Sequence, residues 1–233
     1  MSLNLEKQEE PCAGCRTHCI DCAAVRGGVL ARLIGDGVDD CQFATYTIDA
    51  RKALPDEPLA PGSLVLVRRG VIIRQRLDPG RRPVAVDAIG PGGAFFVTAG
   101  SQAAYAVDRT LICSCDEGVL LRGLKASNHG LSDLHALHAQ SSYRMERLAE
   151  ARGRQSVRAR VAALLSVLAD TLSPHGGPRA QLPSGLLQRD LASLVSTRHE
   201  SVCRILRDLS QEGIVEHGPD GIRILDRSRL AQI

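Results

Sequence analysis

Aromatic side chains are scarce in this chain. Tryptophan is absent, tyrosine and phenylalanine occur three times each, and aromatic residues make up 3% of the 233 positions. Leu, Val, Ile and Ala must therefore supply most of any core. No apolar run approaches the ~20 residues that a membrane span requires, and the first ten residues have no stretch typical of a signal peptide. These absences predict a cytoplasmic protein of one large or two modest domains, with no membrane partner.

Lysine is also scarce, since it occurs only at Lys7, Lys52 and Lys125, and arginine carries nearly all of the positive charge. The formal net charge of +3 is too small to indicate a partner. Arginine favours forked contacts with phosphates and with guanine, which points to a nucleic acid. A genome rich in G and C would produce the same bias, so composition leaves both explanations open.

Four of the eight cysteines lie close together near the start of the chain, at Cys12, Cys15, Cys19 and Cys22. Thiolates this close in sequence can converge on one metal centre without the help of a folded core. Cytosolic thiols stay reduced, so a disulfide framework is the weaker interpretation, and the cluster indicates metal or redox chemistry. A thiol switch, or four cysteines with no joint role, are the alternatives.

Short apolar runs recur between Gly and Pro turns from about residue 43 to 122, which predicts a β-sandwich or barrel. Gly90-Pro91-Gly92-Gly93 lacks the Lys-Ser/Thr pair of a phosphate loop and is interpreted as a turn. A brief helix is expected near Val29–Leu33. The predicted strands lie around residues 63–67, 71–73, 83–86, 94–97 and 110–113.

Residues from about 128 to 172 carry apolar side chains at three- and four-residue steps, which predicts a helix. Its length predicts a break near Gly153 or Gln155. On a heptad counted from Leu131, His138 and Ser141 fall on the seam, so a coiled coil here would be weak. We favour a seam between two copies of the chain, because a DNA reader of the kind predicted below needs two-fold symmetry. Packing of this helix on the β region is the alternative.

Residues 186–225 carry the second strong pattern. Two short apolar helix faces are separated at Ser196-Thr197, and Gly213 follows the second as a typical C-cap. Short apolar runs then flank Gly218-Pro-Asp-Gly221, which predicts a hairpin. Helix, short turn, helix and hairpin together predict a winged helix-turn-helix.

The second helix is expected to present its N-terminal end to the major groove of DNA. Arg204 can donate twice to guanine, and Glu200 can accept from a cytosine amino group. Thr197-Arg-His-Glu200 also fits a capping box in which Glu200 bonds only to the Thr197 backbone, and Arg204 could be a solvated surface charge. The candidate DNA-binding residues are Arg198, His199, Glu200, Cys203, Arg204 and Arg207, of which Arg198 and Arg207 are placed for phosphates.

Over most of its length the chain resembles the CRP/FNR family of bacterial transcription regulators. The family's Glu-(Ser/Thr)-(Val/Ile)-x-Arg recognition core stands here as Glu200-Ser201-Val202-Cys203-Arg204. The resemblance implies that Glu200 and Arg204 read a G·A core in each half of a palindrome, and that His199 and Cys203 tune the outer bases. It implies an α+β fold with a cysteine-rich segment (1–30), a β-roll or jelly-roll sensor barrel (31–127), a dimerisation helix (128–172) and a winged helix-turn-helix domain (173–233).

Within that family the head resembles the oxygen-sensing FNR branch, because Cys15-x-x-x-Cys19-x-x-Cys22 is similar to that branch's cysteine stretch. Cys113 falls where FNR-like proteins place a distant ligand on a barrel strand. The resemblance implies a [4Fe–4S] cluster that favours the DNA-binding dimer and breaks down in oxygen. The FNR pattern has a further ligand six residues after the last cysteine of the trio, where this chain has Gly28.

A cluster takes four thiolates, and five cysteines are candidates: Cys12, Cys15, Cys19, Cys22 and Cys113. We favour Cys113 with three head cysteines, since a ligand from the barrel would link the cluster to the dimer helix. Cys115 is a further candidate ligand, because a regular strand would point it to the same face as Cys113. Cys41 is interpreted as a structural or incidental thiol. Zinc held by the four head cysteines is the alternative. Oxygen, nitric oxide and other redox signals all stay open.

Cyclic-nucleotide-binding relatives use a Glu and an Arg of the barrel, but the matching stretches Gly92–Phe96 and Gln102–Val107 contain no charged residue. Burying a phosphate without a cation is costly, so no cyclic nucleotide is expected, and Arg109 is the nearest residue that could overturn this. No His-Glu-x-x-His motif occurs, so a metal-dependent enzyme is the weakest alternative. The expected partners are a palindromic DNA operator, a second copy of the chain and RNA polymerase.

Overall fold

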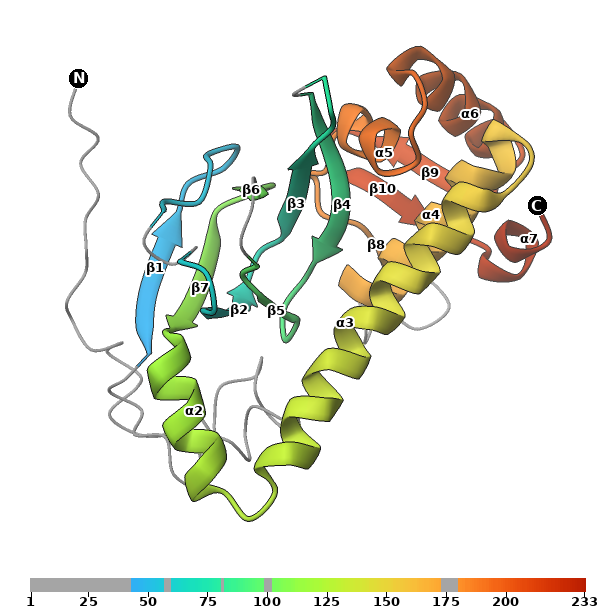
Figure 1. Cartoon of the computed structure of the whole chain (residues 1–233). Helices are drawn as coiled ribbons and strands as arrows, with labels where there is room; N and C mark the ends of the chain where they lie inside the picture. The colour runs from blue at the N-terminus through green and yellow to red at the C-terminus, as the bar shows by residue number, and fades with distance from the viewer. Residues whose placement is uncertain (1–42, 57–59, 81, 99–101, 173–179) are drawn as a thin grey trace, which may run out of the picture.

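Two antiparallel β-sheets form the N-terminal domain of the computed structural model, which describes residues 43–56, 60–80, 82–98, 102–172 and 180–233 (Figure 1). One sheet has the strand order β1-β7-β2-β5 and the other has the order β4-β3-β6. The strands are β1 (Ala44–Ile48), β2 (Leu64–Arg69), β3 (Ile72–Leu77), β4 (Pro83–Ile89), β5 (Ala94–Phe96), β6 (Gln102–Ala106) and β7 (Thr110–Cys115). The expected β-sandwich or barrel is therefore confirmed.

Successive side chains of each strand point to opposite faces of its sheet, and this separates the hydrophobic core into distinct layers. Val65 and Val67 of β2 face Ile72 of β3 in the layer between the two sheets. Leu64 and Leu66 face the opposite side, where α2 covers the four-stranded sheet. The outer face of the three-stranded sheet packs against α4 and the C-terminal domain in one continuous cluster.

The β region ends earlier than the sequence predicted, because residues 117–122 are helical. Helix α2 spans Glu117–Ala126, and the carboxylate of Asp116 caps it by accepting a hydrogen bond from the Val119 backbone N–H at 2.8 Å. Aspartate at an N-cap satisfies one of the free N–H groups of the first turn. This capping signal was overlooked in favour of the apolar residues that follow.

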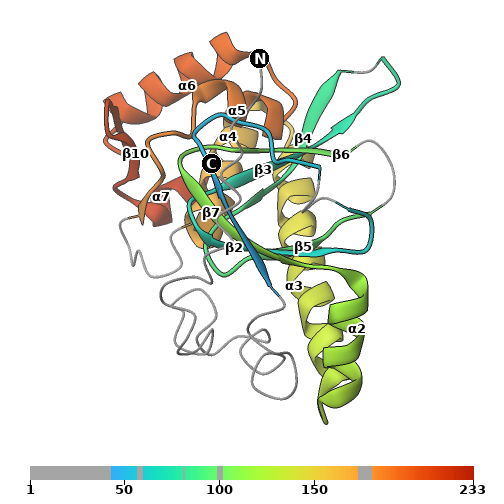
Figure 2. The same ribbon diagram turned by 90° about the vertical axis from the view of Figure 1, so that its left-hand side faces the viewer.

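The long helix breaks where the sequence predicted. Helix α3 spans Gly130–Gly153 and α4 spans Val157–Leu172. The Ser156 hydroxyl accepts from the Ala159 backbone N–H at 3.0 Å, so α4 begins with its own cap. Figure 2 shows α2 and the first turns of α3 below the sheets, from where α3 rises beside them toward α4.

Packing on the β region, the alternative expected for the face of α3, is found for part of this helix. Leu137 and Leu148 are buried against the sensor domain and α4, and the His138 ring stacks on Phe96 with centroids 4.9 Å apart. His138 therefore contacts the sensor domain rather than a free seam. Other large apolar side chains of α3 face solvent, with Leu131 86% exposed, Tyr143 63% and Met145 42%.

The C-terminal domain has the predicted order of helix, turn, helix and hairpin. Its third strand, β8, pairs with β10 on the side opposite β9. Within the part of the chain that the structure describes, no helix is long and apolar enough to cross a membrane. The elements are β8 (Ala180–Gln181), α5 (Gln188–Leu194), α6 (His199–Gln211), β9 (Val215–Gly218), β10 (Gly221–Ile224) and α7 (Arg227–Ala231).

Candidate DNA-reading surface and sensor site

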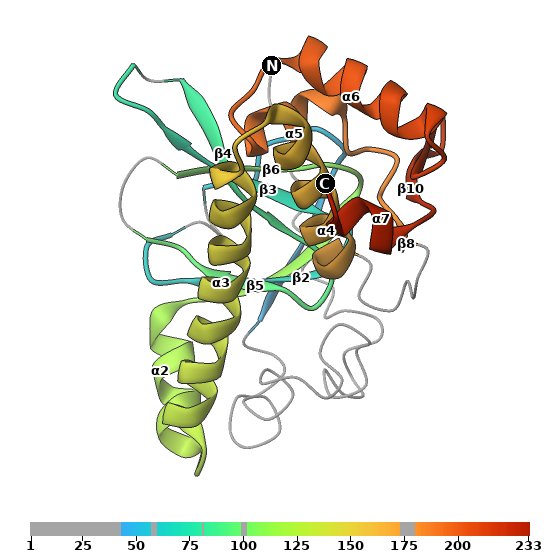
Figure 3. The same cartoon turned by 90° about the vertical axis from the view of Figure 1, so that its right-hand side faces the viewer.

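Helix α6 has one fully buried face and one exposed face. The buried face consists of Val202, Ile205, Leu206 and Leu209, which join the core of the C-terminal domain. Figure 3 shows α6 on the outside of this domain, beyond α5. Because apolar residues recur at three- and four-residue steps, the polar residues between them must point to solvent. The exposed face carries Arg198, His199, Glu200, Arg204 and Arg207.

The ends of α6 are fixed by its backbone. The Thr197 N–H donates to the Ala192 carbonyl at 2.9 Å and Arg198 is the N-cap without a side-chain cap bond, so the proposed Thr197–Glu200 capping box is wrong. At the other end Gly213 has φ +69°. Its N–H donates to Ser210, and that of Ile214 donates to Leu209, which is the Schellman arrangement of a glycine C-cap. The predicted C-cap is confirmed.

The charged side chains on the exposed face of α6 have no polar partner among the described residues. Arg198, Glu200 and Arg204 form no hydrogen bond or ion pair with any residue that the structure describes, and the same holds for Arg207. Arg189 on α5 is a further exposed arginine of this kind, which the sequence argument missed. Its position one residue after Gln188, outside the apolar face of α5, was the available signal.

Cys203 differs from the other predicted DNA-contacting residues because it is half-buried. Its Sγ donates to the Gln188 Oε1 at 2.7 Å and lies 3.4 Å from the His199 Nε2. The Gln188 Nε2 in turn lies 3.2 Å from the His217 Nε2 on β9. This chain of contacts links α6, α5 and the hairpin, so the thiol that was expected to tune outer bases also joins the elements of the domain.

In the sensor domain, Cys113 and Cys115 point to the same face of β7, as predicted. Both are buried in the layer beneath α2, together with Leu137 of α3. Cys113 lies opposite Thr45 of β1, with 3.8 Å between its Sγ and the Thr45 Oγ1. Burial raises the pKa of the Cys115 thiol to about 12, since desolvation disfavours the thiolate.

The head cysteines Cys12, Cys15, Cys19 and Cys22 lie outside the described residues, as do Cys41 and the helix expected near Val29. Among the residues that are described, no three Cys, His, Asp or Glu side chains come together as a metal site. Cys113 and Cys115 are soft thiol donors of the kind that iron–sulfur clusters and zinc use. Two donors are fewer than either centre needs, so the remaining ligands would have to come from the head.

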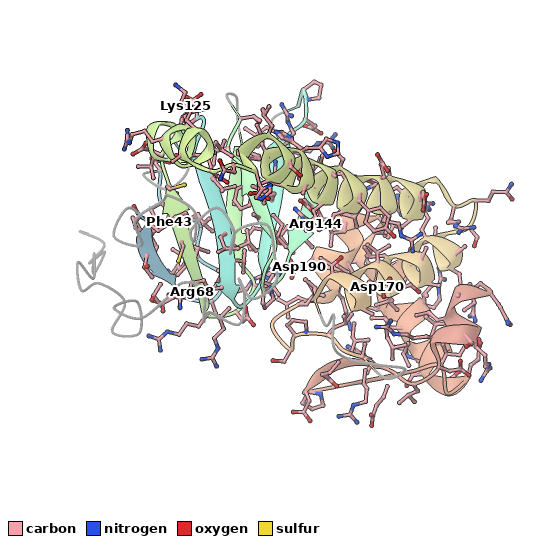
Figure 4. The ribbon with its side chains drawn as sticks, turned by 90° about the horizontal axis from the view of Figure 1, so that it is seen from below. Phe43, Arg68, Lys125, Arg144, Asp170 and Asp190 are labelled. Carbon is pink, nitrogen blue, oxygen red and sulfur yellow. The ribbon has the colours of Figure 1, made fainter. Side chains whose placement is uncertain are left out.

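A buried ion-pair cluster that the sequence did not reveal lies between β3, β4 and α3. The Asp87 carboxylate is fully buried, 3.4 Å from an Arg144 nitrogen and 3.6 Å from an Arg74 nitrogen. Arg144 also donates to the Ala94 carbonyl at 2.9 Å, and Figure 4 shows it reaching from α3 toward the sheet. Burial raises the pKa of Asp87, against the opposing effect of the two arginines. Arg109, the residue noted for a cyclic phosphate, is exposed in the turn before β7.

Helix α5 is attached to the sensor domain by a second charged group. The Arg51 guanidinium donates to both oxygens of the Asp190 carboxylate, at 2.7 and 2.9 Å, and the Tyr105 hydroxyl donates to the same group at 2.8 Å. The hydrogen bond with Asp190 raises the pKa of Arg51, and burial raises that of Tyr105. Arg51 has φ +65°, a conformation that costs a non-glycine residue ~1–3 kcal/mol.

Two further contacts surround this group. The Ser193 hydroxyl of α5 accepts from the Ala85 backbone N–H at 3.1 Å. Arg152 of α3 donates to the Leu194 carbonyl at 2.6 Å and to the Ala85 carbonyl at 2.9 Å. Figure 4 places Asp190 where the sensor strands meet the C-terminal domain.

Comparison with known proteins gives the same architecture. Residues 159–233 match the family model of the Crp-like helix-turn-helix domain. The chain is 25% identical over 224 residues to the transcriptional activatory protein AadR of Rhodopseudomonas palustris, covering 93% of this chain and 91% of that protein.

Solved structures share the fold. FixK2 from Bradyrhizobium japonicum matches with a TM-score of 0.69 at 21% identity, covering 82% of this chain and 96% of its own. The CRP-family regulator TTHB099 from Thermus thermophilus matches with a TM-score of 0.60 at 20% identity, covering 80% and 94%. Residues 159–233 are thus a Crp-like helix-turn-helix domain, and over most of its length the chain is similar to DNA-binding transcription regulators of the CRP/FNR type, which are regulators rather than enzymes.

Proposed function

We propose that this regulator binds a palindromic operator as a homodimer and senses oxygen or another redox signal through a [4Fe–4S] cluster. The cluster would be held by Cys113 and three of the four head cysteines, Cys12, Cys15, Cys19 and Cys22. One observation carries the proposal. Strand β1, which the chain enters directly from the segment that bears the head cysteines, is paired with β7 so that Thr45 lies opposite Cys113.

Cys113 fits a ligand role better than Cys115 does. A thiolate at Cys113 has the Thr45 hydroxyl within 3.8 Å as a possible donor. Burial and the nearby Asp116 raise the pKa of the Cys115 thiol to about 12, which disfavours the thiolate that a metal ligand needs. When bound, the cluster would supply a redox-labile cross-link between the head and β7.

The surroundings of Cys113 offer a route to the dimer helix. Cys113 shares its hydrophobic layer with Val119 of α2 and Leu137 of α3. A change in the packing of β7 would therefore reach α3 directly. The exposed Leu131, Tyr143 and Met145 of α3 are suited to contact with a second copy, because burying them removes apolar surface from water.

On the operator, Glu200 and Arg204 would read base edges, while Arg198 and Arg207 would contact phosphates. His199 and Cys203 would lie beside the outer bases. Exposure without any partner among the described residues leaves these charged groups available for DNA. Likeness to AadR, named as an activatory protein, favours activation through RNA polymerase. No cyclic nucleotide is part of this proposal.

The alternative is the same regulator with structural zinc on the four head cysteines, or with a thiol switch. In that case Cys113 would be a packing residue of the layer beneath α2. Four cysteine thiolates suffice for a closed zinc site, so the two proposals differ in whether β7 supplies a ligand.

Anaerobic purification of the full chain, with absorption spectra and assays of iron, sulfide and zinc, tests the proposal. We expect a brown protein that loses iron in air and with it operator affinity. Cys113→Ala should lose the cluster, whereas Cys115→Ala, which removes a thiol from the same face of the same strand, should retain it. Cys12→Ala should also retain it.

A colourless protein without iron would overturn the cluster. Zinc that survives air, together with operator binding that ignores oxygen, would establish the alternative.

A further inference from the structure

Helix α5 is joined to the sensor domain by the charged group of Arg51, Tyr105 and Asp190, beside the Ser193–Ala85 hydrogen bond. We propose that Arg51 and Tyr105 are positioning residues for operator binding. They hold α5, and through it α6, at the orientation that lets both reading helices of a dimer engage a palindrome at once. This inference rests on the proposed function in one respect, which is that the chain binds its operator as a dimer.

The geometry of the group suits it for fixing an angle. The Arg51–Asp190 pair is bidentate, and two parallel hydrogen bonds restrict rotation as well as distance. Asp190 cannot swing away, since its Oδ2 also accepts from the Leu187 backbone N–H at 2.9 Å and its side chain is only 2% exposed. The Asp190 carboxylate is therefore held in place on α5, where it accepts hydrogen bonds from Arg51 and Tyr105 of the sensor domain.

On the side of the sensor domain, the backbone of Arg51 is also held by hydrogen bonds. The Arg51 N–H donates to the Ala106 carbonyl at 2.8 Å, and the Ala106 N–H donates to the Lys52 carbonyl at 2.9 Å. These bonds to β6 hold Arg51 in the left-handed region, with φ +65°. An arginine persists there only where its surroundings require it, and here the result is a guanidinium directed at α5.

The docked orientation leaves the candidate reading face of α6 exposed. Helix α6 packs against α5 through its buried face, which leaves Arg198, Glu200 and Arg204 exposed on the other side. The sensor domain contacts α5 at Asp190 and at Ser193, and the three charged residues of α6 stay exposed. The contact therefore fixes the direction of the reading surface without occupying it.

Arg51 is also close to the candidate sensor site along the chain. Strand β1 ends at Ile48, three residues before Arg51, and β1 pairs with β7 at Thr45 and Cys113. A shift of β1 against β7 would reach Arg51 through this short turn. The same group that orients α5 is thus placed to transmit the state of the sensor.

The test compares a palindromic duplex, enriched from a random library by the wild-type protein, with a duplex in which one half is scrambled. Joining two binding heads raises affinity by about 10²–10⁴-fold when the geometry allows both to bind. We expect wild-type protein, prepared anaerobically, to prefer the full palindrome by about 100-fold. Arg51→Ala should reduce that preference to below about 10-fold and leave half-site affinity within about 2-fold, because only the joint geometry is lost.

Companion variants separate orientation from folding. Arg51→Gly suits the left-handed backbone and should behave like Arg51→Ala, and Tyr105→Phe should show a smaller change in the same direction. Arg109→Ala, which removes an exposed sensor-domain arginine, should match wild type. Arg51→Ala should also tolerate an extra base pair between the half-sites, which wild type should reject.

An unchanged preference in both Arg51 variants would overturn the inference while leaving the proposed dimer intact. Equal losses on full and half sites, or tighter operator binding, would overturn it as well. A wild-type protein that does not distinguish full from half sites would instead refute the proposed dimeric reader.

Discussion

Arginines inside the sensor domain and arginines on the reading surface are used in opposite ways. Arg74 and Arg144 converge on buried Asp87, and Arg51 grips Asp190. On the reading surface, Arg198 and Arg204 are exposed and without a partner among the described residues. The first group is fixed by carboxylates of the fold, and the second is left for an anionic ligand.

This difference shows why arginine content alone was an ambiguous guide. A buried guanidinium must be paired, because an uncompensated charge in the interior is very costly. An exposed guanidinium without a partner costs little at any position. The lack of a partner therefore indicates a ligand-binding role only where several such arginines lie on one helix face. Substitutions that remove one arginine or its carboxylate distinguish the two classes.

Removing the buried carboxylate should have the largest effect. Asp87→Ala leaves Arg74 and Arg144 without their carboxylate, and breaking a buried ion pair typically costs ~3–5 kcal/mol of unfolding free energy. Urea unfolding followed by circular dichroism measures the loss. Asp78→Ala, which breaks an exposed pair with Arg82 and a hydrogen bond from the Arg82 backbone N–H, is the control and should lower the unfolding midpoint far less. Equal unfolding midpoints for Asp87→Ala and Asp78→Ala would contradict the distinction between buried, paired arginines and exposed ones.

Arg204→Ala should affect DNA binding alone. Each base contact is worth ~1–3 kcal/mol, so loss from both protomers of the proposed dimer should weaken operator binding by about 30-fold or more. Thermal stability should not change, because Arg204 is exposed and has no partner among the described residues. Anisotropy titrations with operator and with random DNA measure both affinities. A loss of similar size on random DNA would assign Arg204 to phosphate rather than to bases.

Arg207→Ala should weaken binding to all sequences by a similar factor of a few. A phosphate contact carries no sequence information, and its loss should lower the slope of log affinity against log salt by about 1 per protomer. Titrations across a salt series measure this slope. Discrimination between operator and random DNA that collapses in this variant would mean that Arg207 reads bases.

The elements with strong local signals could be predicted from the sequence. The apolar steps of 202, 205, 206 and 209, the Gly213 cap and the Gly218–Gly221 turn are all local patterns, and each is confirmed. Helix α2 was missed because its apolar residues continue those of β7, although Asp116 marks its start. The break after Gly153 was predicted, yet the stacking of His138 on Phe96 depends on packing with β5 and was not.

The parts of the site that depend on distant pairing could not be predicted. Asp87 and Arg144 are far apart in sequence, and nothing local marks either as a partner of the other. Arg51 and Asp190 likewise meet only because α5 lies against the three-stranded sheet of the sensor domain. The pairing of β1 with β7, which brings the entry of the head to Cys113, is a property of strand order. The family resemblance identified Cys113 as a candidate ligand. Its pairing opposite Thr45 and its burial could be seen only in the structure.

Arg158 provides the intermediate case, because it is both exposed and paired. It donates to both carboxylate oxygens of Glu212 at 2.7 Å, between α4 and the end of α6, and the two side chains are 34% and 40% exposed. Exposed ion pairs contribute about 0–1 kcal/mol, since water screens the attraction and two long side chains must be ordered. Arg158→Ala should therefore lower unfolding free energy by less than about 1 kcal/mol and leave operator affinity unchanged. Double-mutant cycles with Glu212→Ala measure the pair itself, and a coupling of the size predicted for Asp87 would show that pairing, rather than burial, decides how much an arginine of this protein stabilises the fold.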